Sequence, residues 1–172
     1  GDDFRFGRGR EGDFELLEKT GSEKGFEVER AQTLEFEGER ISSSRVRESL
    51  ANGDFELAKA LMGRPYSIMG RVVYGRQLGR QLGVPTANVR LQRYRSALEG
   101  VYSVSVDGLD VGRKNGIANI GIRPTVGGKE PLLEVHLFDF SGDIYGHLIS
   151  VTFHQKIRDE QQFASIDLLK TQ

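Results

Sequence analysis

One stretch, Gly70 to Val89, constrains the fold more than any other part of the chain, and it reads GRVVYGRQLGRQLGVPTANV. It begins with β-branched and aromatic residues, Val72 to Tyr74, which favour a strand. Glycines then recur at Gly75, Gly79 and Gly83, where a backbone without side chains can approach a ligand closely. We therefore expect a strand followed by a loop that can hold a ligand.

The end of this stretch combines Pro85 with two polar residues. Pro85 has a fixed φ and pushes the residue before it into an extended conformation, so Thr86 and Asn88 are expected on one face of a strand-like segment. A hydroxyl and an amide oxygen beside a loop that contains Arg80 suit a hard cation and phosphate groups. A glycine-rich hairpin loop with a structural Thr and Asn is the alternative, which composition alone favours.

Composition narrows the class of protein. The chain has 172 residues, a net charge of −1 and no cysteine. The charge gives no reason to expect a nucleic-acid partner, and the absence of cysteine favours the cytoplasm. No apolar run is long enough for a membrane span, and no signal peptide is visible. The chain begins without methionine and stops inside a helical pattern, so we expect that both ends are cut. The oligomeric state is not predicted.

The first part of the chain has a helical pattern. Asp13 is expected to cap a helix over residues 14–19 that ends at Gly21, and residues 26–34 alternate as in a strand. A further helix begins at the serines after Ile41, and its start is either a simple cap or an anion site. Asp54 caps the next helix, over 55–62, and we expect a domain boundary between residues 62 and 63.

From Tyr66 onward the helical period disappears, and short apolar runs follow one another. Six strands are expected, over residues 67–74, 86–91, 100–106, 115–120, 132–140 and 148–153. Without helices between them, they predict an antiparallel barrel or sandwich. Residues 116–121 are expected to lead into a small-residue loop at 123–125, and an amphipathic helix is expected from Ile166.

The run from Leu132 to Phe140 carries a carboxylate among strong β-formers. Alternation assigns Glu134 and His136 to one face and the apolar residues to the other. From the pattern alone, Glu134 is more often a residue of a solvated face than a catalytic group. His136 is more often a packing residue than a base.

The string from Gly75 to Asn88 resembles the riboflavin kinase family, whose P-T-A-N segment holds Mg-ATP. The resemblance implies nucleotide binding by Gly75, Gly79, Arg80, Gly83, Pro85, Thr86 and Asn88, with Thr86 and Asn88 as ligands of Mg²⁺. The L-E-V-H-L segment resembles the family's strand whose glutamate acts on the ribityl 5′-hydroxyl, which implies that Glu134 is the catalytic base. Arg158, Asp159 and Glu160 resemble the family's flavin-side loop.

Residues 1–62 resemble the second half of a bacterial FMN adenylyltransferase domain. In that family the I-S-S-x-x-x-R motif binds ATP phosphates, which implies this role for Ser42, Ser43 and Arg47. The family's first nucleotide motif, H-x-G-H, has no counterpart here. The whole chain thus resembles the C-terminal part of bacterial bifunctional riboflavin kinase/FMN adenylyltransferases: an adenylyltransferase remnant over 1–62 and a kinase domain over 63–172.

The resemblance implies a mainly β fold, a six-stranded antiparallel Greek-key barrel with a C-terminal helix, preceded by an incomplete α/β nucleotidyltransferase segment. The implied reaction is transfer of the γ-phosphate of ATP, with Mg²⁺, to riboflavin to give FMN. Two alternatives remain. The intact parent protein makes FAD from FMN, or the truncated form binds flavin or nucleotide without catalysis.

Overall fold

A computed structural model of the chain describes residues 4–75, 86–91, 96–125 and 128–160. The chain divides into two compact units, Gly1–Ser42 and Ser43–Gln172. The helices between residues 43 and 62 belong to the same compact unit as the strands, and the predicted domain boundary between residues 62 and 63 stays a prediction. No helix in the described part of the chain is long and apolar enough to cross a membrane.

The first unit contains the 3-10 helix η1 (Arg8–Arg10), the helix α1 (Phe14–Lys24) and two short strands. Asp13 caps α1 as predicted, because its carboxylate accepts a hydrogen bond from the Leu16 amide at 3.0 Å. The predicted end at Gly21 is wrong, since the helix continues to Gly25, which has a left-handed φ of 78°. Gly21 serves close packing instead: a Cβ there would lie 2.6 Å from the Phe26 carbonyl oxygen.

The strand predicted over residues 26–34 is wrong: these residues are described, and they form neither helix nor strand. The side chains of Phe26 and Val28 lie beside Gly21 of α1. A short hairpin of β1 (Glu35–Phe36) and β2 (Glu39–Arg40) follows. Its turn residues Glu37 and Gly38 both have positive φ, the conformation that a tight two-residue hairpin turn requires.

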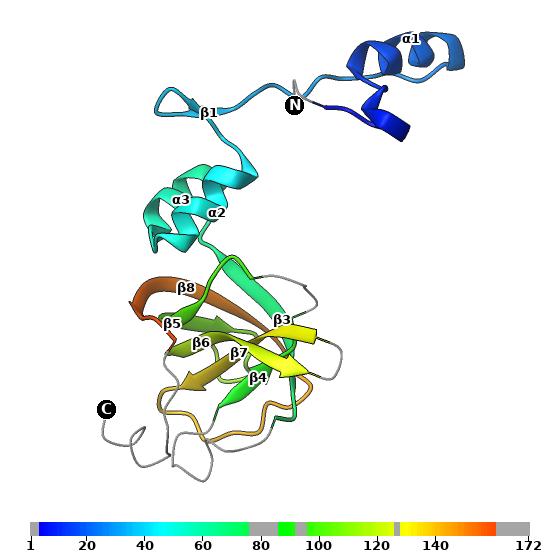
Figure 1. The fold of residues 1–172 in the computed structure, drawn as a ribbon. Coiled ribbons are helices and arrows are strands. Elements are labelled where there is room, and N and C mark those ends of the chain that lie inside the picture. The colour runs from blue at the N-terminus through cyan, green and yellow to red at the C-terminus, as the bar shows by residue number, and fades with distance from the viewer. Residues whose placement is uncertain (1–3, 76–85, 92–95, 126–127, 161–172) are drawn as a thin grey trace. The chain divides into compact units, whose positions relative to one another are not determined.

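The second unit begins with two helices, α2 (Ser43–Ala51) and α3 (Phe55–Met62), which lie side by side (Figure 1). The predicted break between them is confirmed. Gly53 has a φ of 76°, and the Asp54 carboxylate accepts from the Leu57 amide at 2.9 Å. Helix α3 ends at Gly63 in a left-handed conformation.

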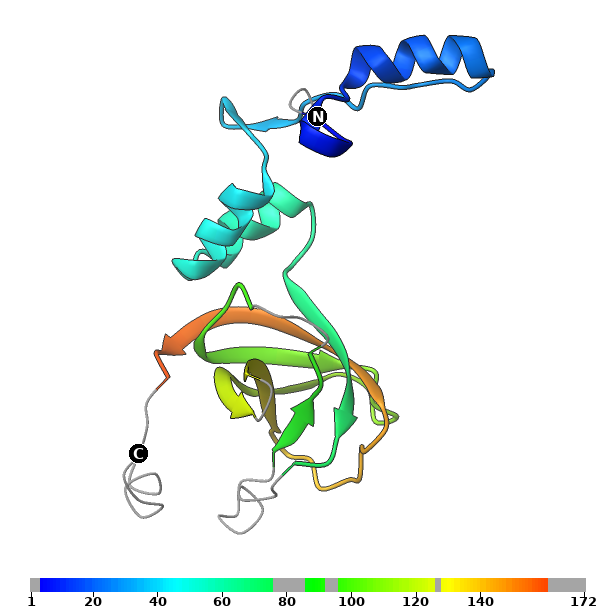
Figure 2. The same cartoon turned by 45° about the vertical axis from the view of Figure 1, so that its right-hand side comes forward.

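Six antiparallel strands form the closed barrel of this unit (Figures 1 and 2). They are β3 (Ser67–Val73), β4 (Ala87–Val89), β5 (Gly100–Asp107), β6 (Lys114–Thr125), β7 (Gly128–Leu137) and β8 (Leu148–Arg158). Their order is β3-β4-β7-β6-β5-β8, so the meander β5-β6-β7 is joined by β4 beside β7, which is a Greek key. The predicted six-stranded barrel is confirmed. The predicted C-terminal helix lies outside the described residues.

The strand predicted over residues 115–120 is confirmed as part of β6, whereas the loop predicted at 123–125 is wrong, because these residues also belong to β6. Only glycine fits at position 116 without a shift, because a Cβ there would overlap the carbonyl oxygen of His136 on β7. In the same way, a Cβ at Gly70 would lie 2.6 Å from the Val89 side chain. At both positions a glycine permits close approach of neighbouring strands, as sharply curved barrel strands often require.

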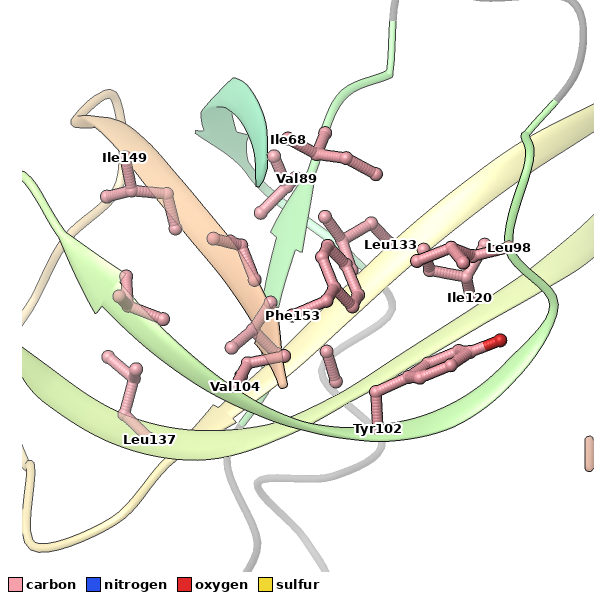
Figure 3. Packing of buried hydrophobic residues seen from close by; sticks show 14 of the residues in the cluster. Ile68, Val89, Leu98, Tyr102, Val104, Ile120, Leu133, Leu137, Ile149 and Phe153 are labelled. Carbon is pink, nitrogen blue, oxygen red and sulfur yellow. The ribbon is translucent and has the colours of Figure 1, made fainter. Parts of the chain in front are cut away.

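Apolar side chains fill the barrel interior (Figure 3). Along the strands these buried residues alternate with more exposed ones. On β7, Leu133 and Val135 are fully buried, whereas Glu134 and His136 are partly exposed. The predicted division of this strand into two faces is therefore confirmed.

The helices α2 and α3 contribute apolar side chains to the same core. Leu50, Phe55 and Ala58 are buried in the cluster that fills the barrel. Phe55 meets Tyr102 of β5 edge to face, with ring centroids 5.8 Å apart, and Tyr102 meets Phe153 of β8 in the same way at 5.5 Å. The helical pair is therefore packed as part of the barrel unit.

We predict that Phe55→Ala destabilises the barrel unit by about 3 to 5 kcal/mol, because it leaves a cavity beside Tyr102. Phe138→Ala is the matched control, since Phe138 is 42% exposed, and should cost less than about 1 kcal/mol. Denaturant unfolding followed by near-UV circular dichroism measures both. Equal costs for the two variants would contradict the assignment of Phe55 to the barrel core.

Candidate functional site

Three polar side chains lie in one row across the outer face of the barrel. Asn88 on β4 is the register partner of Glu134 on β7, and Glu134 is also the partner of Asn119 on β6. Directly opposed residues in antiparallel strands have Cβ atoms about 4.5 to 5.5 Å apart, which allows their side chains to interact. The row therefore brings one carboxylate between two amides.

Alternation along each strand determines the face of the barrel to which these three side chains point. The residues that flank Glu134 in sequence, Leu133 and Val135, are fully buried, and so are Val89 and Ala118 on the neighbouring strands. Because successive side chains point to opposite faces of a strand, the buried neighbours hold the polar row on the other face.

Gly75 packs directly against the amide of Asn88. A Cβ at Gly75 would overlap the Asn88 side chain, so only glycine fits there without a shift. Asn88 is 7% exposed. This contact joins the first predicted nucleotide-binding glycine to the predicted metal ligand, and it holds the amide at one end of the row.

Gly121 has the corresponding position at the other end of the row, two residues beyond Asn119 on β6. A Cβ there would overlap the carboxylate of Glu160. Glu160 belongs to the segment 158–160 that the resemblance assigns to flavin. The structure thus brings this segment to the same face as the polar row.

Ionic contacts fix the start of this segment. Lys156 Nζ lies 2.6 Å from Asp159 Oδ1, and Arg158 donates to the Asp159 carbonyl oxygen at 3.1 Å. The hydrogen bond from Lys156 lowers the pKa of Asp159 below its ordinary value and raises that of Lys156. Both charges are therefore maintained at neutral pH.

A cavity of about 470 Å³ lies where β3, β4 and β7 meet the β7–β8 connection. Its strand walls are Val72, Ala87, Val135 and Leu137, and residues 140–145 form the rest together with Thr86. Pockets of this volume accept small-molecule ligands. Thr86 is thus on the cavity wall, whereas Asn88 is in the polar row. That the two share one face stays a prediction.

The connection over residues 138–147 is held against β3 by several contacts. Tyr145 stacks on Tyr74 with ring centroids 3.9 Å apart, and the Gly146 amide donates to the Val72 carbonyl at 2.9 Å. Arg71 donates to the Gly146 carbonyl oxygen. Within the connection, the Asp143 carboxylate accepts a hydrogen bond from the Tyr145 amide at 3.0 Å. These contacts fix one wall of the cavity.

The remaining predicted residues fall in two groups. Gly79, Arg80, Gly83 and Pro85 lie outside the described residues. Ser43 and Arg47 lie at the start of α2, where Arg47 donates to the Ser43 hydroxyl at 3.3 Å. Ser42 ends the first compact unit.

Sequence reasoning missed Asn119. Its signal was present, since Asn119 is a polar residue between Ala118 and Ile120 in a run of strand-forming residues, as Glu134 is in its own run. The described residues contain no cluster of three or more His, Cys, Asp or Glu that could hold a metal.

A small barrel with a polar row, a ligand-sized cavity and close glycine contacts defines a domain that binds small molecules. The riboflavin kinase family model matches residues 62–172, and a FAD synthetase model matches residues 1–45. The chain belongs to the riboflavin kinase family.

Sequence similarity to known proteins extends over essentially the whole chain. The bifunctional riboflavin kinase/FMN adenylyltransferase of Pseudomonas fluorescens is 56% identical over 99% of this chain, and that of Escherichia coli (strain K12) is 55% identical over all of it. The Haemophilus influenzae protein is 49% identical. The chain spans about half the length of these relatives, 55% or 56%.

A solved structure also resembles the chain. The crystal structure of a protein from Streptococcus pneumoniae, titled a macrolide-efflux protein, superposes with a TM-score of 0.72 at 34% identity. The match covers 98% of this chain and 54% of that one. The resemblance therefore extends to the fold of most of the chain.

We predict that Gly75→Ala destabilises the protein by about 1 to 3 kcal/mol, because its Cβ displaces the buried Asn88 amide. Adding Asn88→Ala should remove part of this cost, with a coupling energy of at least about 0.5 kcal/mol in a double-mutant cycle. Gly121→Ala is the control, since the exposed Glu160 side chain can rotate away, and should change stability by less than about 0.5 kcal/mol. Additive effects at Gly75 and Asn88 would contradict the contact.

Proposed function

We propose that this chain transfers the γ-phosphate of ATP to the 5′-hydroxyl of riboflavin, giving FMN and ADP. The observation that carries the proposal is the register pairing of Asn88 with Glu134 inside a riboflavin kinase domain. In this pairing Glu134, the predicted base, and Asn88, a predicted metal ligand, are directly opposite each other on adjacent strands. The relatives are named for both this reaction and adenylyl transfer to FMN.

The donor chemistry of the site is compatible with Mg²⁺. Mg²⁺ is commonly bound by few protein ligands, and it completes its octahedron with waters and substrate phosphates. Thr86 on the cavity wall and Asn88 in the polar row would supply a hydroxyl and an amide oxygen. When bound, the metal would neutralise phosphate charge. We propose that Thr86, which belongs to the nucleotide motif and lies on the cavity wall, contacts the nucleotide.

Glu134 is the proposed catalytic base. Its carboxylate orients the 5′-hydroxyl of riboflavin and accepts the proton as the oxygen attacks the γ-phosphorus. The new O–P bond forms while the bond between the γ-phosphorus and the β,γ-bridging oxygen breaks, and ADP leaves. Such transfers depend mainly on positioning and charge stabilisation. Asp159 and Glu160 are proposed to contact the flavin. The motif alone supports a role in nucleotide binding for Gly79, Arg80, Gly83 and Pro85.

Adenylyl transfer is the second candidate function, favoured by the FAD synthetase match to residues 1–45. We propose that Ser42, Ser43 and Arg47 belong to its phosphate site in a longer protein. Incubation of the purified chain with riboflavin, ATP and Mg²⁺, followed by separation of flavins, distinguishes the alternatives. FMN alone supports kinase activity, FAD supports adenylyl transfer, and bound but unchanged riboflavin indicates a binding barrel. The cytoplasmic location stays a prediction.

We predict that Glu134→Gln lowers kcat by about 10²- to 10⁴-fold, because glutamine keeps the size of the side chain but cannot accept the proton. Riboflavin affinity, measured by fluorescence quenching, should be retained. His136→Gln on the same strand face is the control and should change kcat by a few-fold at most. An unchanged kcat in Glu134→Gln would exclude Glu134 as the base and make His136 the next candidate.

We predict that Thr86→Val lowers phosphorylation by about 10²-fold, because it removes an oxygen ligand while keeping the branched shape of the side chain. The Mg²⁺ concentration for half-maximal activity should rise. Thr86→Ser keeps the hydroxyl and should retain most activity. Near-normal turnover of the valine variant at low Mg²⁺ would show that this hydroxyl is structural.

A further inference from the structure

Asn119 carries an unusual polar atom. Its side-chain oxygen, Oδ1, is buried and has no hydrogen-bond partner within the structure that the described residues form. Buried polar atoms in folded proteins are nearly always hydrogen-bonded, since an unsatisfied acceptor costs free energy. Such an atom in a native structure therefore calls for a ligand or another functional reason.

The strand register gives the surroundings of this atom. Asn119 is the partner of Glu134 on β7 and of Val101 on β5. Its sequence neighbours Ala118 and Ile120 are buried in the barrel core, so Asn119 is on the outer face with Glu134. Two residues along the same face, Gly121 leaves room for Glu160. Asn119 therefore lies between the proposed base and the flavin-side segment.

The chemistry of an amide oxygen selects its ligand. A carbonyl oxygen accepts hydrogen bonds and donates none, so a hydrogen-bonding partner for it must carry an O–H or N–H group. Phosphate groups that are fully ionised offer only acceptor oxygens. The ribityl chain of riboflavin carries several hydroxyl groups. A polyhydroxyl chain is thus the complementary partner for this atom, and the triphosphate is not.

We propose that Asn119 contacts the substrate: its Oδ1 accepts a hydrogen bond from a ribityl hydroxyl and so holds the chain with its 5′-hydroxyl facing Glu134. This inference rests on the proposed function. It also explains why an amide rather than an aliphatic residue stands between two core positions of β6. Within the described residues the amide oxygen has no hydrogen-bond partner, and a bound ribityl hydroxyl would supply one.

The test compares two ligands on two variants of the whole chain. Riboflavin carries the ribityl chain, whereas lumiflavin has the same ring system with a methyl group in its place. Asn119→Leu removes the acceptor at similar volume, and Asn119→Asp keeps an acceptor oxygen in the same shape. Fluorescence quenching without ATP gives both affinities, and separate assays give FMN formation, the KM for ATP and the Mg²⁺ requirement.

We expect Asn119→Leu to weaken riboflavin binding about 10-fold, the size of effect that follows from losing one hydrogen bond to a ligand, and to leave lumiflavin affinity unchanged. Asn119→Asp should retain riboflavin affinity within about 3-fold, since it keeps the acceptor. The melting temperature of Asn119→Leu should stay equal or rise, because an unsatisfied buried acceptor has been removed. The KM for ATP should not change.

Three results would overturn the proposal. Equal weakening of both ligands would show that Asn119 supports the ring site or the fold. Unchanged affinities with a raised Mg²⁺ requirement would make Asn119 a metal ligand. No effect on any measurement would make it a bystander. Absence of FMN from the wild-type protein tests the proposed function separately, because the comparison of riboflavin with lumiflavin does not depend on turnover.

Discussion

The pairing of β4 with β7 is the interaction on which the candidate site depends. β4 contains only residues 87–89, yet it brings Asn88 opposite Glu134 and Val89 opposite Leu133. A shift of one residue would exchange the two faces of the strand, so that Asn88 would enter the core and Val89 would leave it. The free energy of burying Val89, which is fully buried, therefore also fixes the position of Asn88.

The same strands supply both the barrel core and the polar row. Leu133 and Val135 hold β7 in the barrel, and Glu134 between them is positioned by their packing. Glycines permit the close contacts at each end of the row: Gly75 touches Asn88, and Gly121 admits Glu160. Side chains on strands with buried neighbours are held more precisely than side chains on loops, which would suit the proposed phosphoryl transfer, a reaction that depends on positioning more than on covalent help.

The helices α2 and α3 connect the parts of the chain that the two family models match. The models cover residues 1–45 and 62–172, and the segment between them is matched by neither. In the structure this segment contributes Leu50, Phe55 and Ala58 to the barrel core. Leu50, near the C-terminal end of α2, is buried in this core. This end of α2 therefore packs as part of the barrel unit.

The sequence by itself determined the β architecture, the caps at Asp13 and Asp54, and the two faces of β7, because alternation and capping are local patterns. The motif from Gly75 to Asn88 also predicted the family. The end of the first helix at Gly25 is also set locally, because the Gly25 and Phe26 amides both donate to the Gly21 carbonyl oxygen in a helix cap. The tertiary structure decided how distant strands meet. It alone brought Asn119 beside Glu134, because pairing between distant strands depends on the closure of the barrel and not on any single stretch of sequence.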